Sequence, residues 1–359
     1  MKKKLISILG LCSIATQLPA QACTGIKVIA NDGSALYSRT FEWAHSPTNP
    51  MIKTSPRGTQ YSSAIENTIC KVWKSKYASI GITSDTTPFI NEGVNEKGLV
   101  VGMFFFDHYA QYHDFISSEA HNTIDALQLC QYLLSMCENT SQVKDSLKGL
   151  RICGTFRKEL GRDVPVHWRV GDASGKSIII ECVEKKLNVY DDTLGVITNA
   201  PPYPYHIINL CNYINISPKP ASSMKMGGIE IYPSGSGSGL LGLPGDFTPV
   251  SRFIRAAFFL SFSRTPASAY EAMSLSFTIL SNFNIPLSGE LPPETAPHIP
   301  AATQWTTVID ATNRIIYYRT MYNSAIRRIK LDEIKYDRMK EKYIPLDKTH
   351  TESITEVSL

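Results

Sequence analysis

Short runs in which apolar and polar residues alternate recur along this chain, and that pattern predicts β-strands with a buried face. Two such runs, Gly25–Ala30 and Ala35–Thr40, flank Asn31-Asp32-Gly33-Ser34, whose residue types favour a tight hairpin turn. Another strand is predicted to end at Ile197. Further apolar or mixed strands are predicted at residues 70–78, 99–106, 166–170, 177–182, 306–310 and 315–322.

Helical spacing of apolar residues marks other segments. In residues 123–137, leucines and an isoleucine recur three and four positions apart, which predicts a helix with a broad apolar face. Residues 141–150 and 206–214 are expected as further helices. Thr248 followed by Pro249 predicts a helix start, because Thr caps and Pro fits the first position. Strands and helices alternate without repeats or a linker, which favours one α+β domain over residues 23–359. A charged surface tail is expected from about Lys330.

The first 22 residues have the three parts of a secretory signal peptide. Three lysines form a positive start, residues 5–14 are apolar but too short to span a bilayer, and Ala20-Gln21-Ala22 is a small-residue cleavage site. Cleavage after Ala22 would leave Cys23 as the first residue of an exported protein, periplasmic or secreted. The alternative is that this segment forms a buried N-terminal strand or helix.

A cysteine directly after a signal peptide can also be a lipoprotein anchor. Lipoprotein signals usually have a Leu-like residue three positions before the cysteine and small residues between, whereas this chain has Ala20 and the bulky Gln21 there. The two fates exclude each other, because acylation of the α-amine of Cys23 would remove it as a base. The alternative of another class is therefore a lipid-anchored surface protein without catalytic activity.

Composition narrows the classes of partner. The formal charge is +4, of which the three lysines at positions 2–4 contribute three, so the remaining chain sums to about +1. That balance argues against nucleic acid as a partner, and no apolar run after the signal segment is long enough to span a membrane. Seven of the eight cysteines follow the signal segment, and an odd number in an exported chain indicates at least one free thiol.

Cys23 is the leading candidate nucleophile. After cleavage its thiol and its new α-amine would belong to one residue. The ordinary pKa is about 8.5 for a cysteine thiol and about 7.7–8.0 for an α-amine, which suits proton transfer between them near neutral pH. A nearby cation would stabilise the thiolate, and the predicted hairpin returns Arg39 and Glu42 towards Cys23. Taken alone, Arg39 and Glu42 also fit an exposed ion pair of little energetic value.

Two later segments contain further candidates. Asn199 follows a predicted strand and precedes Pro201, so its amide could point at a developing oxyanion or simply shape a turn. Arg252 falls in the first turn of the helix predicted after Thr248, where the helix dipole disfavours a cation. A residue placed against its local preference is a candidate for function, with a solvated surface arginine as the alternative.

Other chemistries lack support in the sequence. Residues 93–106 form a turn and an apolar strand, which could belong to the core or to the wall of a site. The chain has no His-x-x-x-His pair with a glutamate for zinc, no Gly-x-Ser-x-Gly turn and no dinucleotide fingerprint after a strand. We therefore expect an enzyme without metal or cofactor.

Five motifs follow one another in an order that carries a family resemblance. The set resembles the choloylglycine hydrolase family, which comprises bile salt hydrolases and penicillin V acylases, over essentially the whole chain after residue 22. The resemblance implies an N-terminal-nucleophile amidohydrolase with a four-layer αββα sandwich, and a homotetramer. The motifs are Cys23-Thr-Gly, Ser38-Arg-Thr-Phe-Glu-Trp43, Gly93-Val-Asn-Glu-Lys-Gly-Leu99, Ile197-Thr-Asn-Ala-Pro201 and Gly242-Leu-Pro-Gly-Asp-Phe-Thr-Pro-Val-Ser-Arg-Phe253.

The resemblance also implies a role for each candidate. Cys23 would be the nucleophile and, through its amine, the base. Arg39 and Arg252 would stabilise the thiolate and the charged transition state, and Asn199 would donate to the oxyanion. The family usually has aspartate at the position of Glu42, which is one methylene longer, so the contact of this carboxylate with the amine could shift.

The resemblance leaves the substrate open between conjugated bile salts and N-acyl amides such as penicillin V. Both need an apolar acyl pocket, for which Met103 and Phe105 are the expected wall residues. Many family members have Asn or Tyr where Phe105 aligns, and a phenylalanine side chain offers no hydrogen-bond donor. Loss of a polar group favours a bulky apolar acyl group, so the hypothesis from the sequence is a small-molecule bile salt substrate.

Overall fold

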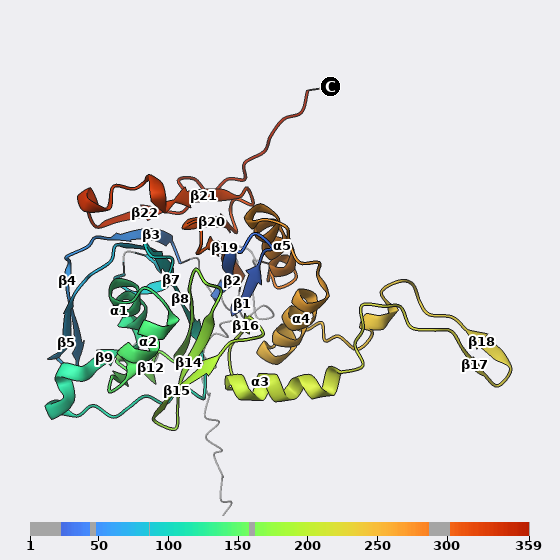
Figure 1. The fold of residues 1–359 in the computed structure, drawn as a ribbon, viewed down its shortest axis with the longest axis horizontal. Coiled ribbons are helices and arrows are strands. Elements are labelled where there is room, and N and C mark those ends of the chain that lie inside the picture. Colours follow the sequence, from blue (N-terminus) through green and yellow to red (C-terminus); the bar gives the residue numbers. More distant parts are fainter. Residues whose placement is uncertain (1–22, 44–47, 86, 158–161, 287–301, 359) are drawn as a thin grey trace, which may run out of the picture.

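The structure is a computed structural model of the 359-residue chain and describes residues 23–43, 48–85, 87–157, 162–286 and 302–358. Two β-sheets stack at its centre, and helices cover their outer faces (Figure 1). This is the predicted αββα arrangement of four layers. In the described residues the first sheet has six strands, all pairing antiparallel, in the order β16 (Val196–Ile197), β1 (Cys23–Ile29), β2 (Ala35–Trp43), β19 (Ala302–Asp310), β20 (Ile315–Thr320) and β21 (Arg327–Lys330).

The second sheet is also antiparallel and forms the other inner layer. Its eight strands within the described residues run in the order β15 (Lys186–Asp191), β14 (Ser177–Val183), β13 (Val166–Gly171), β8 (Val100–Phe105), β7 (Ile90–Asn95), β6 (Ser79–Ser84), β3 (Pro50–Ser55) and β22 (Lys342–Pro345).

Helices bury the apolar outer face of each sheet. α4 (Pro249–Phe262) and α5 (Ala269–Ser281) pack on β1, β2 and β19, and α1 (Leu129–Met136) packs on β7 and β8. α2 (Thr140–Leu147) adds Val143 and Leu147 to the core under α1. α3 (Tyr203–Asn209) follows β16 and packs on α4. Thr248 caps α4 as expected, with its hydroxyl accepting from the Ser251 nitrogen at 3.4 Å.

Buried polar groups tie the two sheets together. Arg169 of β13 donates to the carbonyls of Ile26 at 2.9 Å and Ser38 at 3.1 Å, both on the first sheet. Gly25 makes this approach possible, because a β-carbon there would lie 2.8 Å from the Phe104 ring and 2.9 Å from Arg169. The layer between the sheets is therefore partly polar, and it contains the end of β1 that begins with Cys23.

Smaller two-stranded sheets lie outside the two main sheets. Four two-stranded pairs occur in the described residues: β4 (Gln60–Ile65) with β5 (Thr68–Lys74), β9 (Thr123–Asp125) with β10 (Arg151–Cys153), β11 (Phe156–Arg157) with β12 (Arg162–Asp163), and β17 (Met224–Met226) with β18 (Ile229–Ile231). The β17–β18 hairpin is the tip of an arm that projects from the body of the molecule beyond α4 (Figure 1).

The helix predicted over residues 123–137 is wrong in its first half. Thr123–Asp125 pairs in parallel with β10, residues 126–128 form a 3₁₀ turn, and α1 begins only at Leu129. The Asp125 carboxylate accepts from the Leu127 nitrogen, which stops the helix from extending further towards the N-terminus. Helices expected at 141–150 and 206–214 occur as α2 and as α3 followed by a 3₁₀ turn over Leu210–Tyr213.

The expected surface tail from about Lys330 requires a correction. β22 pairs with β3 at the edge of the second sheet, and Leu346 directly after it is 3% exposed. Residues 351–358 are exposed, so the description as a tail holds only for the last part of the chain. The strand was missed because Lys342-Tyr-Ile-Pro345 lies at a sheet edge, where charged residues and proline are tolerated.

Candidate active site

The β1–β2 hairpin places Arg39 beside Cys23. Cys23 pairs with Phe41 and Gly25 pairs with Arg39, and residues that are opposite or two apart share a face of the sheet. Cys23 and Arg39 therefore both point into the layer between the sheets. Arg39 Nη2 lies 2.8 Å from Cys23 Sγ. Both side chains are buried, Cys23 with 3% and Arg39 with 0% of its surface exposed.

Arg39 is held in this position by carbonyls and aromatic rings. Its Nη1 donates to the carbonyl of Met103 at 2.5 Å and to that of Asn91 at 3.2 Å, on the neighbouring strands β8 and β7. The guanidinium also lies over the Phe104 ring, 4.1 Å from the centroid. These carbonyls and the ring hold the guanidinium beside the sulfur, where its positive charge favours the thiolate.

Asn199 and Arg252 approach the backbone of Cys23 from the side of α4. Asn199, two residues after β16, accepts with Oδ1 from the Cys23 nitrogen at 2.9 Å, and its Nδ2 donates to the Phe105 carbonyl at 2.8 Å. Arg252 donates to Asn199 Oδ1 at 2.5 Å, to Thr24 Oγ1 at 2.9 Å and to the Cys23 carbonyl. Arg252 is 1% exposed, so the alternative of a solvated surface arginine is wrong.

Glu42 lies on the opposite face of β2 from Arg39. The Thr303 hydroxyl donates to its Oε1 at 2.9 Å, and its Oε2 is buried without a hydrogen bond to any of the described residues. Burial raises the pKa of the Glu42 carboxyl to about 7, against the Thr40 hydroxyl and the charge of Arg252, which favour the ionised form. Asn199, rather than Glu42, accepts the hydrogen bond from the Cys23 nitrogen.

The thiol of Cys23 experiences opposing influences. Burial raises its pKa, and the charge of Glu42 acts in the same direction. Arg39 is the strongest influence that lowers this pKa, ahead of the backbone of Glu42 and of Arg252. A thiolate here depends mainly on Arg39, while Arg252 acts chiefly on the backbone of Cys23 and on Asn199.

The two expected wall residues point away from Cys23. The side chain of Met103 belongs to the core beneath α1, together with Trp168 and Leu134. Phe105 lies on the same face of β8 by strand alternation, and only its carbonyl meets the site, through Asn199. The structure thus does not bring either side chain to the sulfur.

Phe104 occupies the face of β8 that Met103 and Phe105 do not. Its ring stacks on Arg39 in the layer between the sheets. Side chains alternate between the two faces of a strand, so the sequence does place Phe104 on the opposite face from Met103 and Phe105. It does not tell which of the two faces is turned towards Cys23. Thr24 was also missed, although it lies inside the Cys-Thr-Gly motif, because its contact with Arg252 depends on how α4 packs.

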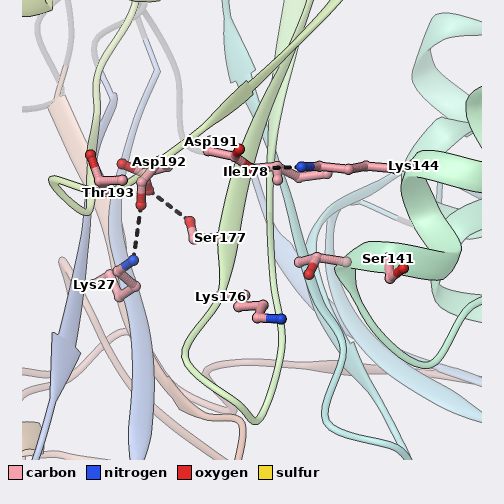
Figure 2. A pocket seen from close by; sticks show the side chains of 10 residues that line it. Lys27, Ser141, Lys144, Lys176, Ser177, Ile178, Asp191, Asp192 and Thr193 are labelled. Atoms are coloured by element: carbon pink, nitrogen blue, oxygen red, sulfur yellow. Dashed lines mark hydrogen bonds and ion pairs between the residues drawn. The ribbon is translucent and has the colours of Figure 1, made fainter.

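A cleft of about 500 Å³ opens at the other end of β1, lined among others by Lys27, Lys144 and Lys176 (Figure 2). Two of these lysines are engaged, Lys27 with the Asp192 carbonyl and Lys144 with the Asp191 carboxylate. Lys27 is four residues along β1 from Cys23, about 13 Å at the usual rise of a strand. The cleft is therefore separate from the cysteine.

Within the described ranges, no group of three or more His, Cys, Asp or Glu side chains is placed to hold a metal ion. The cysteines in those ranges are unpaired, and all except Cys211 are buried. Among the same residues, no helix is long and apolar enough to cross a membrane.

The family model for linear amide C–N hydrolases of the choloylglycine hydrolase family matches residues 23–343. The chain belongs to this family. The bile salt hydrolase/transferase of Clostridium perfringens is 30% identical over 330 residues, which are 91% of this chain and 98% of that protein. The bile salt hydrolase/transferase of Lactiplantibacillus plantarum is 32% identical over 270 residues, 73% of this chain and 79% of that protein.

Solved structures of a conjugated bile acid hydrolase and of a penicillin V acylase share the fold. A cysteine-to-alanine mutant of the conjugated bile acid hydrolase from Clostridium perfringens superposes with a TM-score of 0.80 at 30% identity, over 94% of this chain and 100% of that one. In another variant of the same protein, the replaced residue is an arginine that follows that cysteine by 16 positions. Arg39 follows Cys23 by the same number of positions in this chain. Penicillin V acylase from Agrobacterium tumefaciens has a TM-score of 0.71 at 20% identity, over 89% of this chain and 90% of that one, a likeness of fold.

Proposed function

We propose that this linear amide hydrolase uses Cys23 as an N-terminal nucleophile, and that conjugated bile salts are its substrates. The contact between Arg39 and the Cys23 sulfur is the observation that carries the proposal. It puts a buried cation against a thiol at the first residue that the family model matches. A cation in that place favours the thiolate, which is the reactive form of cysteine.

The geometry supports a two-step reaction. The Cys23 thiol gives its proton to the α-amine, and the thiolate attacks the amide carbon. Asn199 Nδ2 has two hydrogens, of which one is bound to the Phe105 carbonyl, so the other is available to the oxyanion. The protonated amine then gives its proton to the leaving nitrogen. Water, deprotonated by the same amine, releases the acid from the thioester and regenerates the thiol.

Removal of residues 1–22 is part of this proposal. The Cys23 nitrogen is a peptide nitrogen in the full chain and cannot act as a base, whereas after cleavage it is an amine. The signal-like sequence before Cys23 and the start of the family match at that residue support export to the periplasm or the outside of the cell. The interaction of Asn199 Oδ1 with this nitrogen would then hold the amine next to its own thiol.

The mass of the exported protein tests the processing step. We expect the exported chain to begin at an unmodified Cys23. We also expect a form that retains Ala22, because cleavage is blocked, to be inactive. A diacylglycerol adduct would instead support a lipid-anchored surface protein. Normal turnover by a form that retains Ala22 would show that the α-amine is not the base.

The substrate proposal rests on the named activities of relatives that match most of this chain. Several are bile salt or conjugated bile acid hydrolases, whereas the penicillin V acylase shares only the fold. We expect kcat/KM for glycocholate or taurocholate to exceed that for penicillin V, measured on one preparation. Cleavage of penicillin V at least about tenfold faster, or about 1.4 kcal/mol in transition-state binding, would overturn this preference and leave the mechanism intact.

Homo-oligomerisation is also proposed, with the β17–β18 arm as the contact. In this hairpin Met224 pairs with Ile231 and Met226 with Ile229, so four apolar side chains share one face. All four are exposed, each with more than 40% of its surface accessible. An isolated two-stranded hairpin is marginal in water, and a second copy of the chain could cover this face.

A further inference from the structure

Two buried histidines contact consecutive backbone carbonyls at the site. His167 Nε2 lies 3.3 Å from the Thr198 carbonyl, and His206 Nε2 lies 3.0 Å from the Asn199 carbonyl. His167 is 2% and His206 is 3% exposed. They come from different elements, β13 and α3, and so hold the Thr198–Asn199 segment from two directions. Neither histidine touches the Cys23 sulfur in the contacts that the structure describes.

Each imidazole is itself fixed in place. His167 stacks on Phe106 with centroids 4.4 Å apart, and its Nδ1 lies 3.0 Å from a carboxylate oxygen of Glu181. The same carboxylate accepts from the Tyr203 nitrogen at the start of α3, the helix that contains His206. One buried acid thus links the two histidines.

His206 is held on its other side by α4. Its ring stacks on Phe253, with centroids 4.6 Å apart and planes 14° from parallel. Phe253 directly follows Arg252, which donates to the Asn199 side chain. A carbonyl oxygen can only accept, so His206 Nε2 carries the proton in this contact. Burial lowers the pKa of His206 to about 4, which leaves the ring neutral near pH 7.

We infer that His206 and His167 are positioning residues for Asn199, acting through the backbone carbonyls of Asn199 and Thr198. Asn199 Nδ2 offers a hydrogen to the oxyanion, so a displacement of the Asn199 backbone moves this donor away from its productive place. An oxyanion donor must lie within about 0.5 Å of its productive place to be effective. The inference rests on the role proposed above for Asn199.

His206→Phe tests this inference, because it keeps an aromatic ring against Phe253 and removes the N–H. With glycocholate and with penicillin V as probes, we expect kcat to fall about tenfold or more for any amide that the wild type cleaves, with KM within about twofold. Alkylation of Cys23 by iodoacetamide should keep its rate and pH profile, since that reaction forms no oxyanion. His206→Gln places an amide N–H near the position of Nε2 and should recover most of the lost kcat.

The matched control is His113, whose Nδ1 lies 3.1 Å from the backbone of Ile152, away from the site. His113→Phe also removes a histidine–backbone contact and should lower stability without lowering kcat. The pair His206→Gln and His206→Asn repeats the comparison if the phenylalanine variant does not fold, because the shorter asparagine cannot reach the carbonyl.

The inference would be overturned by unchanged kcat in His206→Phe, by equal kcat in the Gln and Asn variants, or by loss of alkylation together with turnover. A fall in kcat for one amide but not for another that the wild type also cleaves would point to the substrate pocket and overturn it as well. The proposed function is judged separately, on whether the wild type cleaves the amides at all.

Discussion

At the scale of single residues, the two arginines of the site differ in what they touch. Arg39 contacts the sulfur of Cys23, whereas Arg252 contacts the carbonyl of Cys23 and the side chains of Thr24 and Asn199. Both are buried, and the family resemblance gives both the same role, stabilisation of the thiolate and the transition state. Because their contacts differ, we propose that Arg39 favours ionisation of the thiol and that Arg252 fixes the geometry of the groups around it.

Arg39→Gln should therefore move the pH profile of Cys23 alkylation to higher pH. A cation beside sulfur favours the thiolate, so its removal raises the pKa of the thiol. The reactive thiolate then forms only at higher pH. Arg252→Gln should lower kcat with a smaller shift of that profile. The control is Arg255→Gln, one turn along α4, where the guanidinium binds the carbonyls of Pro244 and Asp246. A larger shift for Arg252 than for Arg39 would contradict this division.

At the scale of elements, the C-terminal segment contributes to the second sheet. β22 covers the edge of β3, and the nitrogen of Leu346 donates to the Pro50 carbonyl at 2.9 Å. The side chain of Leu346 joins the main core, whereas Ile354 farther along is 82% exposed. Leu346 is therefore a core residue and Ile354 a surface residue, although both belong to the same charged C-terminal segment.

Leu346→Ala should destabilise the protein by about 2–4 kcal/mol, because it removes buried methyl groups and leaves a cavity. Ile354→Ala is the control and should change the free energy of unfolding by less than about 0.5 kcal/mol. Denaturant titration of both variants measures the difference. Equal effects would mean that β22 does not dock on the sheet in solution.

At the scale of the whole molecule, the β17–β18 arm predicts how copies of the chain assemble. Met226→Lys with Ile229→Lys places charges on the apolar face of the hairpin and should shift the sedimentation coefficient towards that of a monomer. Lys225→Gln with Glu230→Gln changes the neighbouring cross-strand pair, which lies on the opposite face, and should leave assembly unchanged. A wild-type protein that sediments as a monomer at assay concentration would refute the proposal.

The sequence by itself determined the elements whose signals are local. The Asn31–Ser34 turn set the first hairpin, and its register put Arg39 near Cys23. Thr248 and Pro249 marked the start of α4. These local predictions succeeded because turn residues, caps and the period of a strand depend on neighbours in the chain. The αββα fold was instead implied by the resemblance of the ordered motifs to a known family.

Only the tertiary structure decided which side chains meet. It turned Phe104 towards Arg39 and Met103 and Phe105 away, since the face of a strand that meets the site depends on what packs against it. It brought Arg252 from a helix more than 200 residues away to the backbone of Cys23. It also made strands of Thr123–Asp125 and of Lys342–Pro345, where pairing partners distant in sequence outweighed local preference.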